Sequence, residues 1–138
     1  MSAEMNAMDQ TNLVLAKILQ LALENGIRYW SLSFAELELE SDYEDYFFPC
    51  VQWLEAEGLI RFDDLGQTMG GPAEGSVDNI SLTSRGMAVL GQKIEIDGVQ
   101  ESIASAVKKV SAGSVNYHGI GDAIGGVLGG FVKSLGSG

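Results

Sequence analysis

Two side chains in this sequence could act as a nucleophile or a general base near neutral pH, namely Cys50 and His118. Cys50 lies on the apolar face of a predicted helix, where a free cysteine packs as a small hydrophobic residue. His118 lies in a predicted link, with no acidic or metal-binding partner beside it. The chain also lacks a phosphate-binding P-loop and a Gly-x-Ser-x-Gly motif. We therefore expect no catalytic residue and no enzyme activity.

The other residues with chemical potential are carboxylates, which are dense in the middle of the chain. Six of them form a candidate partner-binding surface: Glu36, Glu38, Glu40, Asp42, Glu44 and Asp45. Dense carboxylates can hold calcium, but this stretch has no EF-hand loop with its central glycine. A single cysteine excludes a cysteine-rich zinc site, so we expect no metal and no cofactor. Two interpretations stay open: a solvated face whose acids suit helix N-termini, or a docking surface for a basic protein.

The composition indicates a folded and strongly acidic protein. The chain has 138 residues, 46% of them hydrophobic, and its 19 acids and 8 bases give a formal charge of -11. Such a charge repels phosphate backbones and anionic membranes and attracts basic partners. The N-terminus has no signal-peptide pattern, and no run of 18 apolar residues occurs. We therefore expect a cytoplasmic protein.

Helical spacing and end signals predict two helices in the first 40 residues. The first is capped by Asp9 or Thr11 and ends at Gly26, with leucine and isoleucine recurring three and four apart between them. The second starts at Ser33 with the capping-box pattern Ser-Phe-Ala-Glu. Leucines alternate with glutamates after this start, so the end of the second helix is not defined by the pattern.

A third helix followed by a hairpin is predicted next. The helix starts at Ser41 with a second capping-box pattern and is closed by Gly58. Pro49 lies inside it and either deletes one backbone hydrogen bond or marks a fresh start. A Gly-rich tip connects two predicted strands, whose inward residues are Ile60, Phe62, Ile80 and Leu82. Thr83 then caps a fourth helix, which runs to about Gln92.

Three helices followed by a hairpin, with Gly-Leu-Ile at residues 58–60 and Ser-Leu-Thr-Ser-Arg-Gly at residues 81–86, resemble a winged helix-turn-helix domain. The resemblance covers about residues 10–92. It implies an α+β, mostly helical fold with three helices and a β-hairpin wing, to which one or two C-terminal helices are added. Proteins of this family mostly bind DNA through the third helix and the wing, and many serve as protein-interaction modules.

The charge of the predicted third helix departs from the DNA-binding pattern. No lysine or arginine occurs between Arg28 and Arg61, and the wing tip at residues 64–78 has no base either. DNA affinity depends largely on phosphate neutralisation, and base contacts rely on arginine and lysine. The sequence therefore argues against nucleic acid as a partner. A DNA-binding regulator would need an unusual basic surface formed by Lys93, Lys108 and Lys109.

Beyond the resemblance we expect four segments in all: a flexible N-terminus at 1–9, the winged-helix domain at 10–92, a linker and helix at 93–113, and a Gly-rich amphipathic tail helix at 114–138. Apolar residues form a narrow stripe on the 93–113 helix, which ends at Gly113. These residues are Val99, Ile103, Val107 and Val110.

The tail helix has an apolar arc bordered by glycines. Its candidate residues for partner binding or self-association are Ile120, Ile124, Val127, Leu128, Phe131, Leu135, Gly121, Gly125 and Gly129. Glycine costs about 1 kcal/mol per residue in a helix relative to alanine, so this helix forms only if its apolar arc is covered. Its own domain, a second copy or another protein, and a membrane surface are the three possible covers. Charge and length disfavour the membrane, because the segment is too short to span a bilayer and has Lys133 as its single base.

The function expected from these patterns is a small, acidic, non-catalytic winged-helix module for protein interaction or regulation. An inhibitor or neutraliser of a basic, nucleic-acid-handling protein would need such an acidic face. Two alternatives stay open: a DNA-binding transcriptional regulator, and a self-associating or peripheral membrane protein that acts through its tail.

Overall fold

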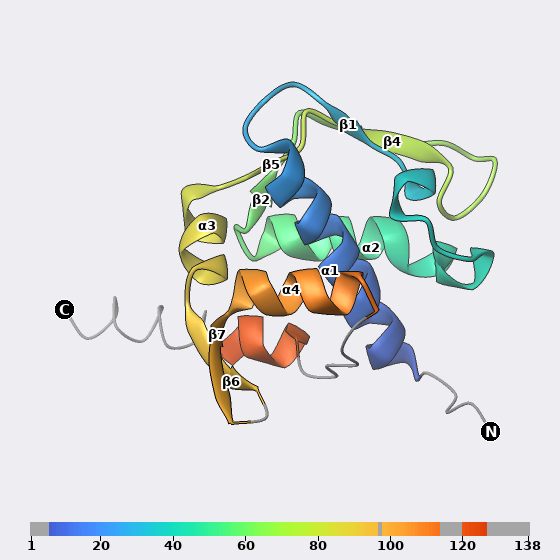
Figure 1. Ribbon diagram of the computed structural model, residues 1–138. Coiled ribbons are helices and arrows are strands. Elements are labelled where there is room, and N and C mark those ends of the chain that lie inside the picture. The colour runs from blue at the N-terminus through green and yellow to red at the C-terminus, as the bar shows by residue number, and fades with distance from the viewer. Residues whose placement is uncertain (1–5, 97, 114–119, 127–138) are drawn as a thin grey trace.

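The computed structural model describes residues 6–96, 98–113 and 120–126. In these residues the helices pack against one another and small antiparallel sheets lie at their edges, so the fold is α+β (Figure 1). The helices are α1 (Ala7–Asn25), η1 (Phe34–Leu37), η2 (Ser41–Tyr46), α2 (Phe47–Ala56), α3 (Ser84–Leu90) and α4 (Ile103–Ser111), where η marks a 3₁₀ helix. The strands are β1 (Ser31–Leu32), β2 (Ile60–Arg61), β3 (Asp64–Gln67), β4 (Gly75–Asp78), β5 (Ser81–Leu82), β6 (Lys93–Ile96) and β7 (Val99–Ser102).

Helix α1 is the central element, against which α2, α4 and η2 pack (Figure 1). The prediction of its cap was wrong, because Asn6 caps the helix in place of Asp9 or Thr11. The Asn6 side chain accepts a hydrogen bond from the Asp9 backbone N at 2.8 Å, and the Asp9 carboxylate accepts one from the Asn6 N at 3.3 Å. Residues 7–9, expected to be flexible, are therefore helical. The predicted end at Gly26 is confirmed.

The two capping boxes predicted for the next segment do not form. Ser33 precedes η1 and Glu40 precedes η2, and neither makes a side-chain capping hydrogen bond. Alternating leucine and glutamate give an α-helix no continuous apolar face, and a short 3₁₀ turn that buries Leu37 forms instead. Helix α2 begins at Phe47, so Pro49 falls in its first turn, where a backbone N–H needs no helical partner. This is the fresh start that the sequence left as one alternative.

Helix α2 ends just before Gly58, as predicted, and strands β2 to β5 follow it along the chain. Strands β1, β4 and β3 form a three-stranded antiparallel sheet in that order, and β2 pairs with β5. Ile60 faces Leu82 across the β2–β5 pair and both are buried, whereas the expected inward residue Phe62 is only partly buried. Gly75 must be glycine, because its φ is 124° and a Cβ would collide with the Gly66 carbonyl oxygen.

The segment after β5 differs from the predicted linker and helix. Thr83 caps α3 as expected, accepting a hydrogen bond from the Gly86 N at 2.9 Å. Strands β6 and β7 then pair antiparallel, so Val99 lies on a strand with 59% of its surface exposed, and not on the helical stripe. The remaining stripe residues are buried on α4, as the spacing predicted: Ile103, Val107 and Val110.

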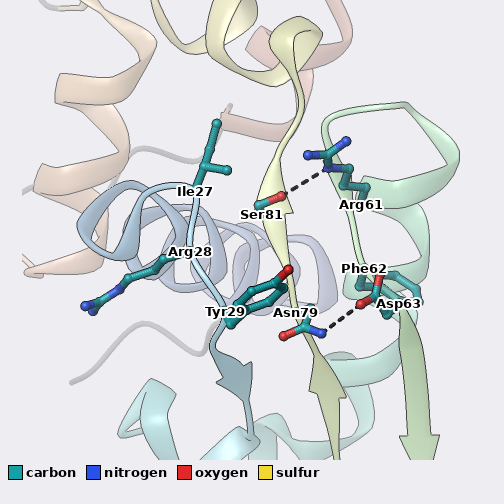
Figure 2. Close-up of a pocket in the computed structure, with 8 residues that line it drawn as sticks. All are labelled: Ile27, Arg28, Tyr29, Arg61, Phe62, Asp63, Asn79 and Ser81. Atoms are coloured by element: carbon teal, nitrogen blue, oxygen red, sulfur yellow. Dashed lines mark hydrogen bonds between the residues drawn. The ribbon is translucent and has the colours of Figure 1, made fainter.

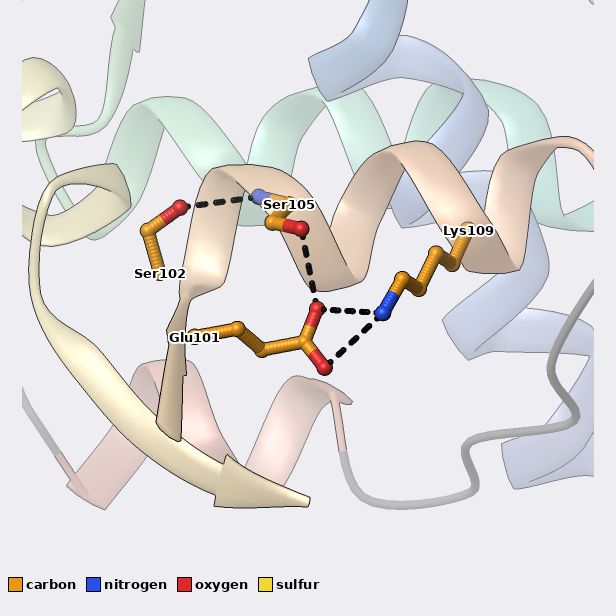
Figure 3. A network of polar contacts seen from close by, with 4 residues as sticks. All are labelled: Glu101, Ser102, Ser105 and Lys109. Carbon is orange, nitrogen blue, oxygen red and sulfur yellow. Dashed lines mark hydrogen bonds and ion pairs between the residues drawn. The ribbon is translucent and has the colours of Figure 1, made fainter. Parts of the chain in front are cut away.

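Polar contacts join this hairpin to α4 (Figure 3). Ser102 caps α4 by accepting a hydrogen bond from the Ser105 N at 3.1 Å. The Glu101 carboxylate accepts a hydrogen bond from Ser105 Oγ at 2.9 Å and pairs with Lys109 Nζ at 3.1 Å. The hydrogen bonds from Lys109 and Ser105 lower the pKa of Glu101. The charged form of this network therefore holds the strand against the helix.

The described part of the tail, residues 120–126, is helical. Ile120 and Ile124 are fully buried in the core of the chain's own domain, and the Gly121 N donates to Asn12 Oδ1 at 3.2 Å. A Cβ on Gly121 would lie 2.8 Å from that oxygen, so this glycine permits close contact with α1. Of the three possible covers, these residues use their own domain. Gly125 borders open space, and the other tail candidates lie outside the described residues: Val127, Leu128, Gly129, Phe131 and Leu135.

Candidate interaction surfaces

The acidic face consists of the six carboxylates at positions 36–45 and lies on η1, η2 and the link between them, on the right of Figure 1. All six are exposed except Glu44, which is half-buried. Buried side chains beneath them hold the backbone in place. Phe47 is fully buried and meets the ring of Phe34 edge-on, with 5.8 Å between the ring centroids. The apolar residues of this segment thus point inward, and its acids point outward.

The charge of the acidic face depends on what pairs with its six carboxylates. Within the residues that the structure describes, none of them forms an ion pair. Their negative potential acts on Tyr43: burial raises the pKa of its hydroxyl above the ordinary value of 10.0, and the carboxylates of Glu40 and Asp42 raise it further. A cation brought to this face would therefore gain interactions that the chain itself does not provide.

In the described residues, bases approach the acidic face at one edge, beside Glu36 and Glu38, and no base occupies an exposed position of α2. The exposed positions of α2 are Pro49, Gln52, Glu55 and Ala56, so its outward surface has no positive charge. The three lysines that a DNA-binding surface would need are spread over the molecule. Lys93 lies on β6, and Lys109 is paired with Glu101. Lys108 and Lys17 border a hollow of about 330 Å³ together with Glu36 and Glu38.

A second surface, the arginine-flanked groove, lies where the link after α1 meets β2 and β5 (Figure 2). This hollow of about 430 Å³ has Arg28 on one side and Arg61 on the other. Arg28 donates to Asn25 Oδ1 at 2.7 Å, and Arg61 Nε donates to Ser81 Oγ at 3.3 Å. In Figure 2 Arg28 extends away from the groove and Arg61 reaches toward Ser81, so the two guanidinium groups do not meet at one point. Tyr29, with 90% of its surface exposed, lies between them.

The sequence reasoning did not identify this groove. Its residues come from three separate segments, around residues 28, 62 and 80, which only the paired strands bring together. The one local signal was the short link after Gly26, where Arg28 and Tyr29 occur side by side in a stretch with little apolar periodicity.

The candidate nucleophile Cys50 is part of the core. It is 4% exposed, and its thiol lies 4.0 Å from the Thr11 carbonyl oxygen. Burial raises the pKa of Cys50 to about 12, so the thiol is protonated and poorly nucleophilic near neutral pH. His118 lies outside the described residues. Within those residues no group of three or more histidine, cysteine, aspartate or glutamate side chains could hold a metal ion.

Across residues 6–96, 98–113 and 120–126, no helix has the length and apolar character needed to cross a membrane. Comparison of the chain with protein-family models, curated proteins and solved structures found no match.

Proposed function

We propose that this chain is a small, non-catalytic interaction module of the winged-helix type, and that its acidic face docks a basic protein. The observation that carries the proposal is the set of six carboxylates on η1 and η2, exposed or half-exposed and without ion pairs in the described residues, in a chain of formal charge -11. Charged surfaces of this kind steer oppositely charged partners and determine their orientation.

The order of the elements supports the winged-helix part of the proposal. A long first helix is followed by β1, by the short helices η1 and η2 with α2, and then by the β3–β4 hairpin. The sheet order β1-β4-β3 places the strand after the first helix beside the hairpin, whose tip spans residues 68–74. This order of elements is compatible with the resemblance, with a 3₁₀ turn in place of the second helix.

The same charges disfavour the DNA-binding alternative. A helix that enters the major groove needs bases on its outward side, and α2 presents Pro49, Gln52, Glu55 and Ala56 there. A basic protein meets no such obstacle. Among basic proteins, those that handle nucleic acid are the natural targets of an acidic face, because their cationic surfaces already suit a polyanion.

The experiment compares two variants with the same total charge. One removes three acids of the face (Asp42→Asn, Glu44→Gln and Asp45→Asn), and the other removes three exposed acids elsewhere (Glu55→Gln, Asp64→Asn and Glu95→Gln). Each changes the formal charge from -11 to -8. Binding of fluorescein-labelled decalysine is measured by anisotropy. Three exposed pairs of about 0.5 kcal/mol each predict a roughly tenfold weaker affinity for the first variant.

The control variant should weaken decalysine binding much less, because its acids lie outside the face. Equal weakening in both variants would show that net charge alone attracts the probe and that no docking face exists. Tight binding of duplex DNA at low salt, weakening steeply as salt is added, would favour the regulator instead.

A further inference from the structure

An apolar groove of about 380 Å³ lies between three parts of the chain: the first half of α1, the η2–α2 segment, and the helical residues 120–126. Hydrogen bonds join α1 to each of the other two walls. Tyr46 Oη donates to Gln10 Oε1 at 3.0 Å, and the Gly121 N donates to Asn12 Oδ1 at 3.2 Å. The Cys50 thiol approaches the Thr11 carbonyl oxygen on the floor of the groove. The groove is therefore formed by packed helices and not by loops.

The lining of this groove has the composition of a protein-binding surface. Met8, with 56% of its surface exposed, and the exposed Pro49 stand at its edge, while Trp53 and Tyr46 are half-buried. Aromatic residues and methionine are enriched at protein interfaces, and tryptophan and tyrosine contribute most strongly to their binding energy. Large apolar side chains that border an open hollow gain free energy when a partner covers them.

The charge at the rim determines what kind of partner fits. Asp122 lines the groove, and Asp45 of the acidic face directly precedes Tyr46 in its wall. No lysine or arginine is among the described residues that line it. A complementary segment is therefore apolar on one side and basic at its edges, which describes a basic amphipathic helix.

We propose that this groove binds the apolar side of a basic amphipathic helix from the partner protein, while the lysines or arginines of that helix pair with Asp45 and Asp122. The inference rests on the proposed function and adds the docking mode to it. Other occupants fit less well: a second copy would bring one chain of charge -11 against another, and the chain's own residues 127–138 have Lys133 as their single base.

The test uses the full chain and two synthetic peptides of about 15 residues, one with leucine and lysine at amphipathic helical spacing and one with the same composition scrambled. Binding is followed by tryptophan fluorescence and by anisotropy at physiological salt. The proposal predicts that the amphipathic peptide binds at least about tenfold more tightly than the scrambled one, because only it presents a continuous apolar side.

Two groove variants and a matched control locate the site. Trp53→Ala and Met8→Ser should each reduce the preference for the amphipathic peptide at least about threefold, and Met8 is exposed enough that its change should not affect folding. Ile27→Ser, which changes a residue that is 65% exposed at the arginine-flanked groove, should leave the preference unchanged.

Four results would overturn the inference, and they differ in whether the proposed function is also contradicted. If the chain binds decalysine but binds the amphipathic and scrambled peptides equally well, the acidic face is a docking surface and the groove is not. If no cationic probe binds, the proposed function fails as well. A roughly tenfold gain in peptide affinity with Phe131→Asp would assign the groove to the chain's own tail. Concentration-dependent dimers that Met8→Ser abolishes would assign it to a second copy.

Discussion

The arginine-flanked groove and the apolar groove enclose similar volumes, about 430 and about 380 Å³, yet they offer a ligand opposite chemistry. The first has two guanidinium groups that donate to neutral side chains on its opposite sides and do not meet. The second is lined by Met8, Pro49 and Trp53, with one aspartate, Asp122, in its lining. The comparison shows that the arrangement of charge around apolar surface, and not the size of a hollow, determines which partners an acidic chain can accept.

The two grooves also differ in how the fold supports them. Tyr46 of the apolar groove directly precedes Phe47, which is fully buried at the start of α2, whereas Ile27, Arg28 and Tyr29 lie on a link whose side chains are largely exposed. Substitutions near the two grooves should therefore lower the free energy of unfolding by very different amounts.

The largest effect is expected for Phe47→Ala. The ring is fully buried and contacts the rings of Phe34 and Phe48, so its removal should lower the free energy of unfolding by about 3–5 kcal/mol. The matched change on the other side, Ile27→Ala, should cost less than about 0.5 kcal/mol because the side chain is 65% exposed. Urea unfolding followed by circular dichroism measures both. A similar decrease in the free energy of unfolding for both variants would contradict the claim that the core supports one groove more than the other.

A smaller effect is expected in the titration of Tyr43. Because burial and then the carboxylates of Glu40 and Asp42 raise its pKa, the variant Glu40→Gln/Asp42→Asn should lower that pKa without restoring the ordinary value of 10.0. A raised pKa of a phenol means that its stabilising contribution is complete below pH 10 and is lost as pH rises through the folded-state value. NMR of the labelled tyrosine ring measures the pKa, and an unchanged pKa would mean that the face exerts no such potential.

The sequence predicted the parts of the fold that depend on local chemistry. Helix ends at Gly26 and Gly58 and the cap at Thr83 were correct, because left-handed glycines and a side-chain cap act within a few residues. The capping boxes at Ser33 and Ser41 were wrong, because the pattern is also compatible with short 3₁₀ turns when the following residues lack a continuous apolar face. The β6–β7 hairpin had a signal that went unused: Ile94 and Ile96 alternate with charged residues before the turn pair Asp97-Gly98.

The candidate surfaces also divide into one that local sequence could identify and two that depend on tertiary packing. The acidic face could be identified from the sequence, because its six carboxylates occur within ten residues. Neither groove could be identified, because each combines segments that only tertiary packing brings together: residues 28 and 61 in one case, residues 8, 53 and 122 in the other. The buried Ile120 and Ile124 show the same limit, since their apolar arc predicted a cover without specifying which one.

The most direct test of the central claim is an amide NMR titration of the full chain with decalysine at physiological salt. The account predicts shift changes concentrated at residues 36–46, with little change at Arg28, Tyr29 and Arg61. Changes spread evenly over acids such as Asp64 and Glu95, or concentrated at the arginine-flanked groove, would contradict it.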